Sequence, residues 1–213
     1  MTTIYLVRHG ETDWNRARKI QGSTDIPLND LGREQAATTG RLLARRQWDG
    51  IYASPLSRAR ETAQIIARET GLGEPELIPA IVERNYGTAE GMTGEDIDRL
   101  FPNSADVPGR ETREAVAERV ITALHTLAAA HPGESVIVVA HGGVIRSVLN
   151  TVEPNAPAEP IRNGSVHSFL HADGGLSLIA FDDPIEVESL DCAEDDLEEQ
   201  NALEGRETSG LVG

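Results

Sequence analysis

The chain has 213 residues and a mass of 23.0 kDa, which suits one domain, or one domain with a tail. No run of about 18 apolar residues is present, which excludes a helical membrane span. A single cysteine, Cys192, excludes an internal disulfide framework and a cysteine-based zinc site. The N-terminus lacks the basic and apolar regions of a signal peptide, so we expect a cytoplasmic protein.

Most of the formal net charge of −16 lies at the C-terminus. From Asp182 to the end there are 12 acidic residues and one basic residue, Arg206, which together contribute −11 and leave −5 for residues 1–181. The body therefore lacks the basic surface that nucleic acids or anionic lipids require. Residues 184–213 are acidic and poor in large apolar side chains, so we expect a disordered tail.

The first part of the chain predicts two strands and two helices. Residues 3–8 are apolar and β-branched, which indicates a buried strand. Residues 30–46 have the apolar spacing of an amphipathic helix. A short strand is predicted at 51–53, and a second helix at 54–70, with Ser54 as its N-cap and a proline in its first turn.

The middle of the chain is less regular. Residues 77–82 predict a weak strand. Residues 84–110 are rich in Gly, Pro, Asn and Asp, and predict an irregular segment with one short helix near 95–101. Apolar residues at helical spacing then predict a long amphipathic helix over 111–130.

The last part of the body predicts a central strand and a hairpin. Residues 135–140 are apolar on both faces, as in a central parallel strand, and a helix is predicted at 143–150. Residues 165–171 and 176–181 alternate around a glycine turn and predict a hairpin. Since strands alternate with helices, residues 1–183 predict a three-layer α/β/α domain with a mostly parallel central sheet.

Polar residues follow two of the predicted strands, where open α/β sheets bind ligands. Arg8-His9-Gly10 ends the first strand, and His141-Gly142 follows the strand at 135–140. Arg58 lies in the first turns of the helix at 54–70, whose dipole favours an anion. Two histidines and two arginines near helix N-termini describe a phosphate pocket.

Longer motifs surround these residues and occur in one order along the chain. They are Leu6-Val7-Arg8-His9-Gly10-Glu11-Thr12-Asp13-Trp14-Asn15, Pro27-Leu28-Asn29-Asp30-Leu31-Gly32, Ser54-Pro55-Leu56-Ser57-Arg58-Ala59-Arg60-Glu61-Thr62-Ala63, Glu83-Arg84-Asn85-Tyr86-Gly87 with Glu90-Gly91, Val138-Val139-Ala140-His141-Gly142-Gly143, and Asn163-Gly164-Ser165. Over about residues 4–170 the sequence thereby resembles the histidine phosphatase superfamily, which contains cofactor-dependent phosphoglycerate mutases and many phosphatases. The resemblance implies a phosphoglycerate mutase-like fold.

The resemblance also implies catalytic roles. His9 would be the nucleophile that attacks phosphorus in line and forms a phosphohistidine. Glu83 would protonate the leaving oxygen and then deprotonate the water that hydrolyses this intermediate. The role of Glu83 requires a carboxyl that is protonated near neutral pH, so we expect it to be partly desolvated.

Other matching residues would bind the phosphoryl oxygens. Arg8, Arg58, Asn15 and His141 would hold these oxygens and offset the charge of the transition state, with the amide of Gly142 as a further donor. Because these groups supply the positive charge, we expect neither a metal nor a cofactor.

Several neighbouring residues have simpler explanations or secondary roles. Glu90 is a second candidate acid, although the family pattern favours Glu83. Trp14 is expected to pack against the active-site loop, and Arg60 and Glu61 to form a solvated pair on their helix. The remaining histidines are expected to be structural or to lie on the surface, namely His125, His131, His167 and His171.

Phosphomonoester hydrolysis is the function that the sequence favours most. Mutases of the family have a longer chain. An insertion between their proton donor and their second histidine covers the active site. The stretch between Glu83 and His141 is short here, and residues 92–110 contain only Arg99 and Arg110 as basic residues. An open pocket admits water and favours hydrolysis.

Two alternatives remain open at this point. The motif from Glu83 to Gly87 looks close to its mutase version, which favours a phosphoglycerate mutase-type phosphotransferase. A non-catalytic phospholigand-binding protein is the third alternative, and the complete set of catalytic residues argues against it.

The expected partner is a small phosphomonoester, either a sugar phosphate or a phosphorylated carboxylic acid. Four residues are candidates for the substrate rim: Gln21, Arg84, Tyr86 and Arg110. We expect a monomer or homodimer, with no nucleic-acid or membrane partner.

Overall fold

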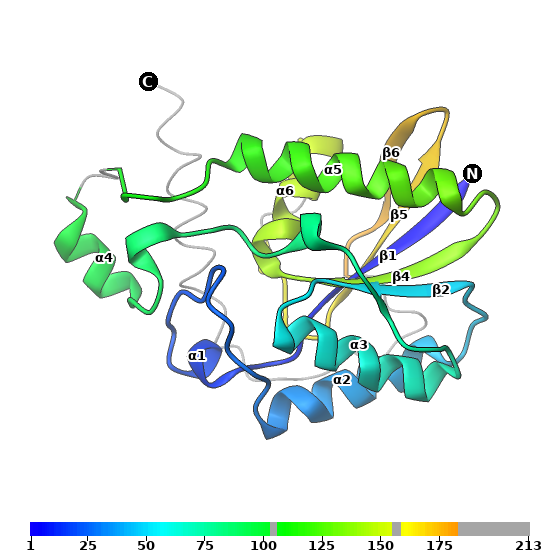
Figure 1. Ribbon diagram of the computed structural model, residues 1–213, viewed down its shortest axis with the longest axis horizontal. Helices are drawn as coiled ribbons and strands as arrows, with labels where there is room; N and C mark the ends of the chain where they lie inside the picture. Colours follow the sequence, from blue (N-terminus) through cyan, green and yellow to red (C-terminus); the bar gives the residue numbers. More distant parts are fainter. Residues whose placement is uncertain (103–105, 155–158, 183–213) are drawn as a thin grey trace.

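A six-stranded sheet in the order β3-β2-β4-β1-β5-β6 forms the centre of the protein (Figure 1). The computed structural model describes residues 1–102, 106–154 and 159–182, so the predicted tail at 184–213 lies outside the described residues. The strands are β1 (Thr2–Arg8), β2 (Gly50–Ala53), β3 (Glu76–Leu77), β4 (Ser135–Ala140), β5 (Val166–Ala172) and β6 (Gly175–Ala180). The first four are parallel, whereas β5 is antiparallel to β1 and β6 is antiparallel to β5. The predicted mostly parallel sheet is confirmed.

Helices cover both faces of the sheet, as predicted. They are α1 (Asp13–Arg16), α2 (Asp30–Leu43), α3 (Ser57–Thr70), α4 (Gly94–Leu100), α5 (Arg113–Ala130) and α6 (Gly142–Val152), with short 3₁₀ helices η1 (Pro79–Ile81) and η2 (Gly87–Ala89). Figure 1 shows α2 and α3 together below the sheet, and α5 and α6 on its other side. Within the described parts of the chain, no helix is both long and apolar enough to cross a bilayer.

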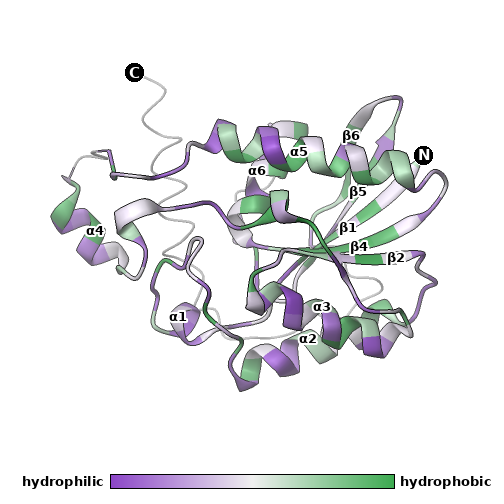
Figure 2. Ribbon diagram, in the orientation of Figure 1, coloured by the Kyte–Doolittle hydropathy of each residue, from purple (hydrophilic) through white to green (hydrophobic). Residues whose placement is uncertain are grey.

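The alternation of side chains along β4 builds a core on each face of the sheet. Val136, Val138 and Ala140 pack against α5 and α6, whereas Ile137 and Val139 pack against α2 and α3. Green apolar positions accordingly concentrate on the strands and on the inner sides of the helices in Figure 2. Each of these large side chains, when fully buried, contributes roughly 1.5–3 kcal/mol relative to exposure.

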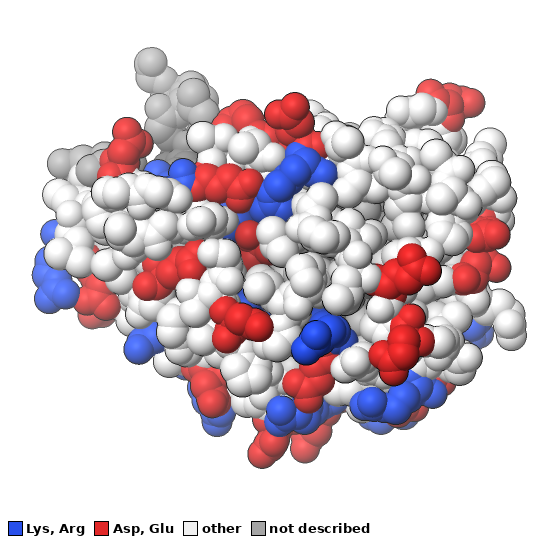
Figure 3. All heavy atoms as spheres, viewed as in Figure 1, with Lys and Arg blue, Asp and Glu red and all other residues white. Residues whose placement is uncertain are grey.

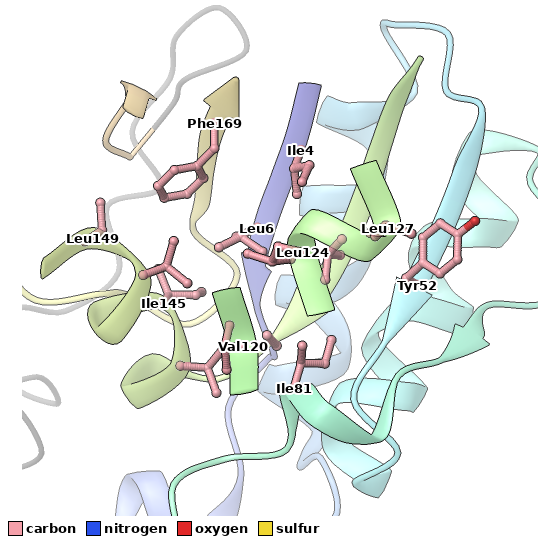
Figure 4. Close-up of a cluster of buried hydrophobic side chains, with 14 of the residues drawn as sticks. Ile4, Leu6, Tyr52, Ile81, Val120, Leu124, Leu127, Ile145, Leu149 and Phe169 are labelled. Carbon is pink, nitrogen blue, oxygen red and sulfur yellow. The ribbon is translucent and has the colours of Figure 1, made fainter. Parts of the chain in front are cut away.

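The larger of the two clusters lies under α5 and α6 (Figure 4). Apolar residues at helical spacing on α5 all face the sheet, as predicted: Val116, Val120, Leu124 and Leu127. Helix α6 adds Ile145 and Leu149, and the sheet presents Ile4, Leu6 and Phe169. This cluster fixes the start of α6, which directly follows His141, relative to the end of β1.

Two predicted boundaries are wrong, and one short helix was not predicted, each for an identifiable reason. The strand expected at 77–82 is only the two residues of β3, because Pro79 has no N–H for a ladder and opens η1 instead. Helix α3 begins at Ser57 and its N-cap is Leu56, so Ser54 is not the cap. The short α1 was not expected, since its four residues carry no apolar period, but Thr12 and Asn15 form its capping box.

His167 is a fully buried, uncharged histidine in β5. Its Nδ1 accepts from the Asp182 N–H at 3.0 Å, so the ring carries its proton on Nε2 and donates to the Ser165 hydroxyl oxygen at 2.9 Å. Burial, with a smaller contribution from Arg146, lowers the pKa of His167 to about 3. The imidazole of His167 is therefore neutral in the folded protein, where it is hydrogen-bonded to Ser165 and to the Asp182 N–H.

This burial predicts a specific loss of stability in acid. Between pH 6.5, the ordinary pKa of histidine, and about pH 3, the unfolded chain binds a proton on His167 that the folded chain does not bind. The free energy of unfolding should therefore fall as the pH falls, by at most about 1.4 kcal/mol per pH unit from this group. In His167→Asn this contribution should disappear, and urea unfolding between pH 4 and 8 measures it.

The matched control is Phe169→Leu, which removes apolar volume from β5, the strand of His167, but no titratable group. Its unfolding free energy should be lower at every pH and should keep the pH slope of the unaltered protein. An equally steep slope in His167→Asn would contradict the linkage between burial of His167 and folding.

Candidate active site

Three parallel strands end at one edge of the sheet and bring the candidate residues together. Arg8 is the last residue of β1, and the N–H of His9 donates to the Ala140 carbonyl at 3.1 Å. His141 follows β4 directly. Ser54 follows β2, and its N–H donates to the Val139 carbonyl at 3.0 Å. Parallel pairing thus places both histidines at the same edge, where ligands of open α/β sheets bind.

The ring of His9 is held in one tautomer. Its Nδ1 lies 2.7 Å from the Gly10 carbonyl oxygen, which can only accept, so Nδ1 carries the proton and Nε2 keeps a lone pair. Burial, followed by the charges of Arg58 and Arg8, lowers the pKa of His9 well below its usual value. A buried, neutral imidazole with a free Nε2 lone pair is suited to nucleophilic attack.

His141 lies beside His9, with ring centroids 5.2 Å apart in an edge-to-face arrangement. Its Nε2 is 2.7 Å from the Ser54 hydroxyl oxygen, while the buried Nδ1 has no hydrogen-bond partner among the described residues. Burial and then the charge of Arg58 lower the pKa of His141 as well, so the ring is neutral. If Ser54 donates to Nε2, the single ring proton is on Nδ1, where it can meet a ligand oxygen.

Two arginines carry the positive charge of the site. Arg8 is buried, donates from Nη1 to the Ile161 carbonyl, and lies close to Gly142, where an added Cβ would be 3.5 Å from Arg8 Nε. Arg58 has no exposed surface. Its Nη groups donate to backbone carbonyls, whereas its buried Nε has no partner in the part of the chain that the structure describes. An unpaired buried donor of this kind favours an anionic ligand.

Glu83 is buried next to the start of α6. Its Oε1 accepts from the Arg84 N–H at 2.8 Å, and its Oε2 accepts from the Gly143 N–H at 3.2 Å. The bond to the Gly143 N–H holds the carboxyl at the start of α6, and Gly143 is two residues after His141 in the chain. Glu83 is therefore buried, as expected from the sequence, and each of its oxygens accepts one hydrogen bond from a backbone N–H group.

Glu90, the second candidate acid, lies in a different environment. Its two oxygens accept from the backbone N–H groups of Ser23, Thr24 and Tyr86 and from the hydroxyls of Ser23 and Thr24. Burial raises the pKa of Glu90, but the hydrogen bonds from Thr24, Ser23 and Tyr86 outweigh it and lower the pKa below its usual value. Glu90 is thus an ionised anchor for a loop, which argues against its use as a general acid.

Asn15 and Gln21 are linked through Thr12 at the edge of the site. The Thr12 hydroxyl lies 3.1 Å from Asn15 Oδ1 and 2.9 Å from Gln21 Oε1. Because Asn15 Oδ1 accepts from Thr12, its amide nitrogen is the end that can donate to a ligand. Gln21 is only 1% exposed and is linked to Asn15 through Thr12, and its contact with substrate stays a prediction.

Of the other rim candidates, two face a cavity and one does not. Arg84 and Arg110 line a cavity of about 610 Å³ between the 106–114 segment and helices α5 and α6. Tyr86 is buried in a small apolar cluster, with the Arg84 guanidinium 5.3 Å above its ring. The aromatic ring therefore supports Arg84 from below, and contact of Tyr86 with substrate stays a prediction.

The remaining walls of the cavity are also rich in charge. Arg113 and Arg146 add two basic groups, and Asp106, Glu111 and Glu114 add three acidic ones. Acidic and basic side chains are likewise interspersed across the face shown in Figure 3. Arg84, which follows Glu83 in the chain, is one of the residues that line this cavity.

Motif residues that make no direct contact with the reacting groups brace the loop that carries His9. The Gly10 N–H donates to the Thr62 hydroxyl at 3.1 Å, and Asn163 Nδ2 donates to the His9 carbonyl at 2.8 Å. Gly10 also lies against the start of α2, since an added Cβ would be 2.1 Å from the Gly32 carbonyl oxygen. This close packing of two backbone segments explains why glycine is required at positions 10 and 32.

The remaining predictions about neighbouring residues have mixed outcomes. Trp14 packs over Gly91, where an added Cβ would be 3.2 Å from the indole. Glu61 pairs with Arg33 of α2 at 2.7 Å, so the pair expected with Arg60 is wrong. The reason is that α2 and α3 pack side by side and present opposite charges to each other.

The other four histidines have partners outside the cluster. His131 lies 2.5 Å from the Tyr52 hydroxyl, and His125 lies 2.9 Å from His171. His167 is hydrogen-bonded to Ser165 and to the Asp182 N–H, as described above. Over residues 1–102, 106–154 and 159–182, no group of three or more His, Cys, Asp or Glu side chains is arranged to hold a metal ion.

Comparison with known proteins identifies the family. The model of the histidine phosphatase superfamily (branch 1) matches residues 4–184. The chain belongs to this superfamily. It is 42% identical over 157 residues to the uncharacterized phosphatase PhoE of Bacillus subtilis (strain 168), and the match covers 74% of this chain and 80% of PhoE. It is 40% identical over 184 residues to phosphoglycerate mutase-like protein 4 of Arabidopsis thaliana, covering 80% of each.

Solved structures agree with this assignment. The phosphoserine phosphatase of Entamoeba histolytica, crystallised in complex with phosphoserine, superimposes with a TM-score of 0.73 at 30% identity, over 85% of this chain and 97% of that one. Other matches to this histidine phosphatase are named glucosyl-3-phosphoglycerate phosphatase and 2,3-bisphosphoglycerate-dependent phosphoglycerate mutase. The relatives therefore carry the names of both activities, hydrolysis and phosphoryl transfer.

The free Nδ1 of His141 generates a prediction about anion binding. His141→Asn keeps an N–H donor near the Nδ1 position, whereas His141→Gln keeps one near Nε2, on the Ser54 side. Because Nδ1 is the nitrogen without a partner, the Asn variant should bind inorganic phosphate about tenfold more tightly than the Gln variant. Isothermal titration calorimetry measures both affinities.

His131→Gln is the control, since His131 bonds to Tyr52 and Glu134 and should leave phosphate affinity unchanged. A Gln variant that binds phosphate as tightly as the Asn variant would show that Nδ1 is not the ligand-facing nitrogen.

Proposed function

We propose that this histidine phosphatase is a phosphomonoesterase that hydrolyses small phosphorylated metabolites through a phosphohistidine on His9. The observation that carries the proposal is the neutral His9 ring, fixed by the Gly10 carbonyl with its Nε2 lone pair free, beside His141 and two buried arginines. This arrangement combines a nucleophile with donors for a phosphoryl group.

The first step forms a bond between His9 Nε2 and phosphorus as the ester P–O bond breaks. Arg8, Arg58 and His141 would hold the non-bridging oxygens, with the Asn15 amide and the Gly142 N–H as further donors. Glu83 would transfer its proton to the leaving oxygen, which departs as an alcohol.

The second step regenerates the enzyme. The ionised Glu83 would take a proton from a water molecule, whose oxygen attacks phosphorus as the P–N bond breaks. Inorganic phosphate leaves, His9 returns to its neutral form, and Glu83 is again protonated. The two steps use Glu83 in opposite directions, as acid and then as base.

The charged cavity supports an acidic leaving group. Arg84 lies in its wall directly after Glu83, and Arg110, Arg113 and Arg146 add further positive charge. A carboxylate on the leaving group would meet these guanidinium groups when the ester oxygen faces Glu83. A phosphorylated carboxylic acid or a sugar phosphate is therefore the favoured substrate class, and solved relatives hold phosphoserine and 3-phosphoglyceric acid.

Hydrolysis is favoured over mutase activity by the shortness of the segment between Glu83 and His141. A mutase must retain a bisphosphorylated intermediate and exclude water, which takes several basic groups for a second phosphate, whereas residues 92–110 contain only Arg99 and Arg110. The motif Glu83-Arg84-Asn85-Tyr86-Gly87 and the mutase-like Arabidopsis relative support the mutase as the second candidate.

Replacement of the nucleophile tests the covalent step. His9→Ala should lose turnover of p-nitrophenyl phosphate, by a factor on the order of a thousand or more, and should also lose the acid-labile, alkali-stable phosphoenzyme. Rapid quenching with ³²P-labelled substrate detects this intermediate. A His9→Ala protein that still forms it would overturn the assignment of His9.

The same quench experiments separate the two candidate activities. With 3-phosphoglycerate as substrate, hydrolysis releases inorganic phosphate, whereas a mutase forms 2-phosphoglycerate without net release. Isomerisation that outpaces phosphate release would favour the mutase.

Replacement of the proton donor should depend on the leaving group. Glu83→Gln should slow phosphorylation of His9 by about 10²–10⁴-fold with alkyl phosphates, whose alkoxides leave poorly without a proton. The loss should be smaller with p-nitrophenyl phosphate, whose phenolate leaves without full protonation. Burst kinetics measure the step for both esters, and equal losses would contradict Glu83 as the general acid.

A further inference from the structure

The carboxylate of Glu90 is bound by the loop at residues 22–24. Its Oε1 accepts from the Ser23 N–H at 2.8 Å, the Ser23 hydroxyl at 3.0 Å and the Tyr86 N–H at 3.1 Å. Its Oε2 accepts from the Thr24 N–H at 3.0 Å and from the Thr24 hydroxyl. Hydrogen bonds to an ionised acceptor are roughly twice as strong as neutral ones, so this carboxylate fixes the loop firmly.

Gly22 allows the loop to approach the carboxylate this closely. A Cβ added at this position would lie 2.1 Å from Glu90 Oε1, and the Gly22 φ of +54° is in the left-handed region. A side chain at position 22 would therefore be strained and would displace the carboxylate. Both observations indicate that the conformation of the 22–24 loop depends on the Glu90 carboxylate.

The opposite side of the same loop binds Arg58. The Gly22 carbonyl accepts from Arg58 Nη2 at 2.7 Å, and the Thr24 carbonyl accepts from Nη1 at 2.8 Å. The Gly22 carbonyl and the Ser23 N–H belong to one peptide group, which thus lies between the Arg58 guanidinium and the Glu90 carboxylate. Its dipole is aligned with both charges, and hydrogen bonds in such a chain strengthen one another.

The position of Arg58 therefore depends on Glu90. With both Nη groups tied to the loop, the guanidinium is oriented so that its buried Nε remains without a partner among the described residues. We propose that Glu90 is a positioning residue for the reaction, which acts through the peptide between Gly22 and Ser23 to orient Arg58 toward the phosphoryl group. The proposal rests on the proposed function for its catalytic consequence, but not for its effect on anion binding.

A double-mutant cycle between Glu90 and Arg58 tests this inference. Glu90→Gln keeps the shape of the side chain but turns an amide N–H₂ toward the donors of the loop. In the presence of Arg58 it should lower kcat/KM for p-nitrophenyl phosphate by about tenfold to a hundredfold, because a small misplacement of a binding group has an effect of this size. In an Arg58→Ala background the same change should lower kcat/KM by less than about threefold, since the group that it positions is gone.

The leaving group provides a readout that separates positioning from proton donation. Arg58 faces the phosphoryl group, which is the same in all substrates, so Glu90→Gln should affect alkyl phosphates and p-nitrophenyl phosphate equally. A larger loss with alkyl phosphates would instead identify Glu90 as a proton donor and overturn the proposal. An equal loss in both Arg58 backgrounds would show that Glu90 has only a general structural role, and would also overturn the proposal.

Two further variants keep the test sharp. Glu61→Gln makes the same chemical change on α3, the helix of Arg58, but at a surface pair with Arg33, and should leave kcat/KM within about twofold. Thr24→Val deletes a single hydroxyl donor to Glu90 and should reproduce the leaving-group-independent loss in weaker form. This milder variant carries the test if Glu90→Gln does not fold.

Binding of inorganic phosphate distinguishes failure of the inference from failure of the proposed function. Calorimetric titration of the four proteins in the cycle requires no turnover and should show the same dependence on Arg58. A protein that hydrolyses no phosphomonoester but shows this coupling would refute only the proposed function. Additive phosphate affinities in an active enzyme would refute only the role of Glu90.

Discussion

The burial of a positive charge is the constraint on which the rest of the site depends. Arg58 has no exposed surface, and an uncompensated buried ion would be destabilising by several kcal/mol. Burial lowers the pKa of Arg58, while the carboxylates of Glu83, Asp25 and Glu90 act in the opposite direction. Backbone carbonyls of the 22–24 loop accept from both Nη groups. The protein thus holds the charge in place without neutralising it completely.

The same charge determines the state of both imidazoles. Arg58 and Arg8 lower the pKa of His9 and of His141, in addition to the effect of burial. A protonated imidazole has no lone pair for attack, so the arginines favour the form of His9 that its proposed role as nucleophile requires. In the proposed reaction, a phosphoryl group bound beside Arg8 and Arg58 would compensate their positive charge.

Much of this arrangement could be predicted from the sequence, because parallel strands end at one edge of a sheet. Arg8, His9 and His141 follow apolar runs that predict β1 and β4, and Arg58 lies near the start of a helix that follows β2. The motifs around Thr62 and Asn163 were recognised by resemblance, and the structure shows their physical role as braces for the His9 backbone.

Side-chain direction in irregular segments could not be predicted in this way. Ser54 has the residue type and position of a helix cap, but its hydroxyl faces His141, because α3 begins later. The 22–24 loop has no apolar period, so nothing in the pattern indicates that it connects Glu90 to Arg58. The excursion after Glu83 has a small apolar cluster of its own, which includes Tyr86, and no period in the sequence indicates it.

The carboxylates of Glu83, which is buried, and Glu90, which is partly buried, show how environment separates residues of the same chemical type. Glu90 accepts from five donors that fill both of its oxygens, and its hydrogen bonds keep it ionised. Glu83 accepts from two backbone N–H groups, one on each oxygen, so each oxygen keeps a lone pair that can carry a proton. A group that exchanges protons with substrate and water needs such a free site, whereas a group that anchors a loop needs all of its sites occupied. The number of donors around each carboxylate therefore supports the proposed proton transfer by Glu83 and the proposed positioning role of Glu90.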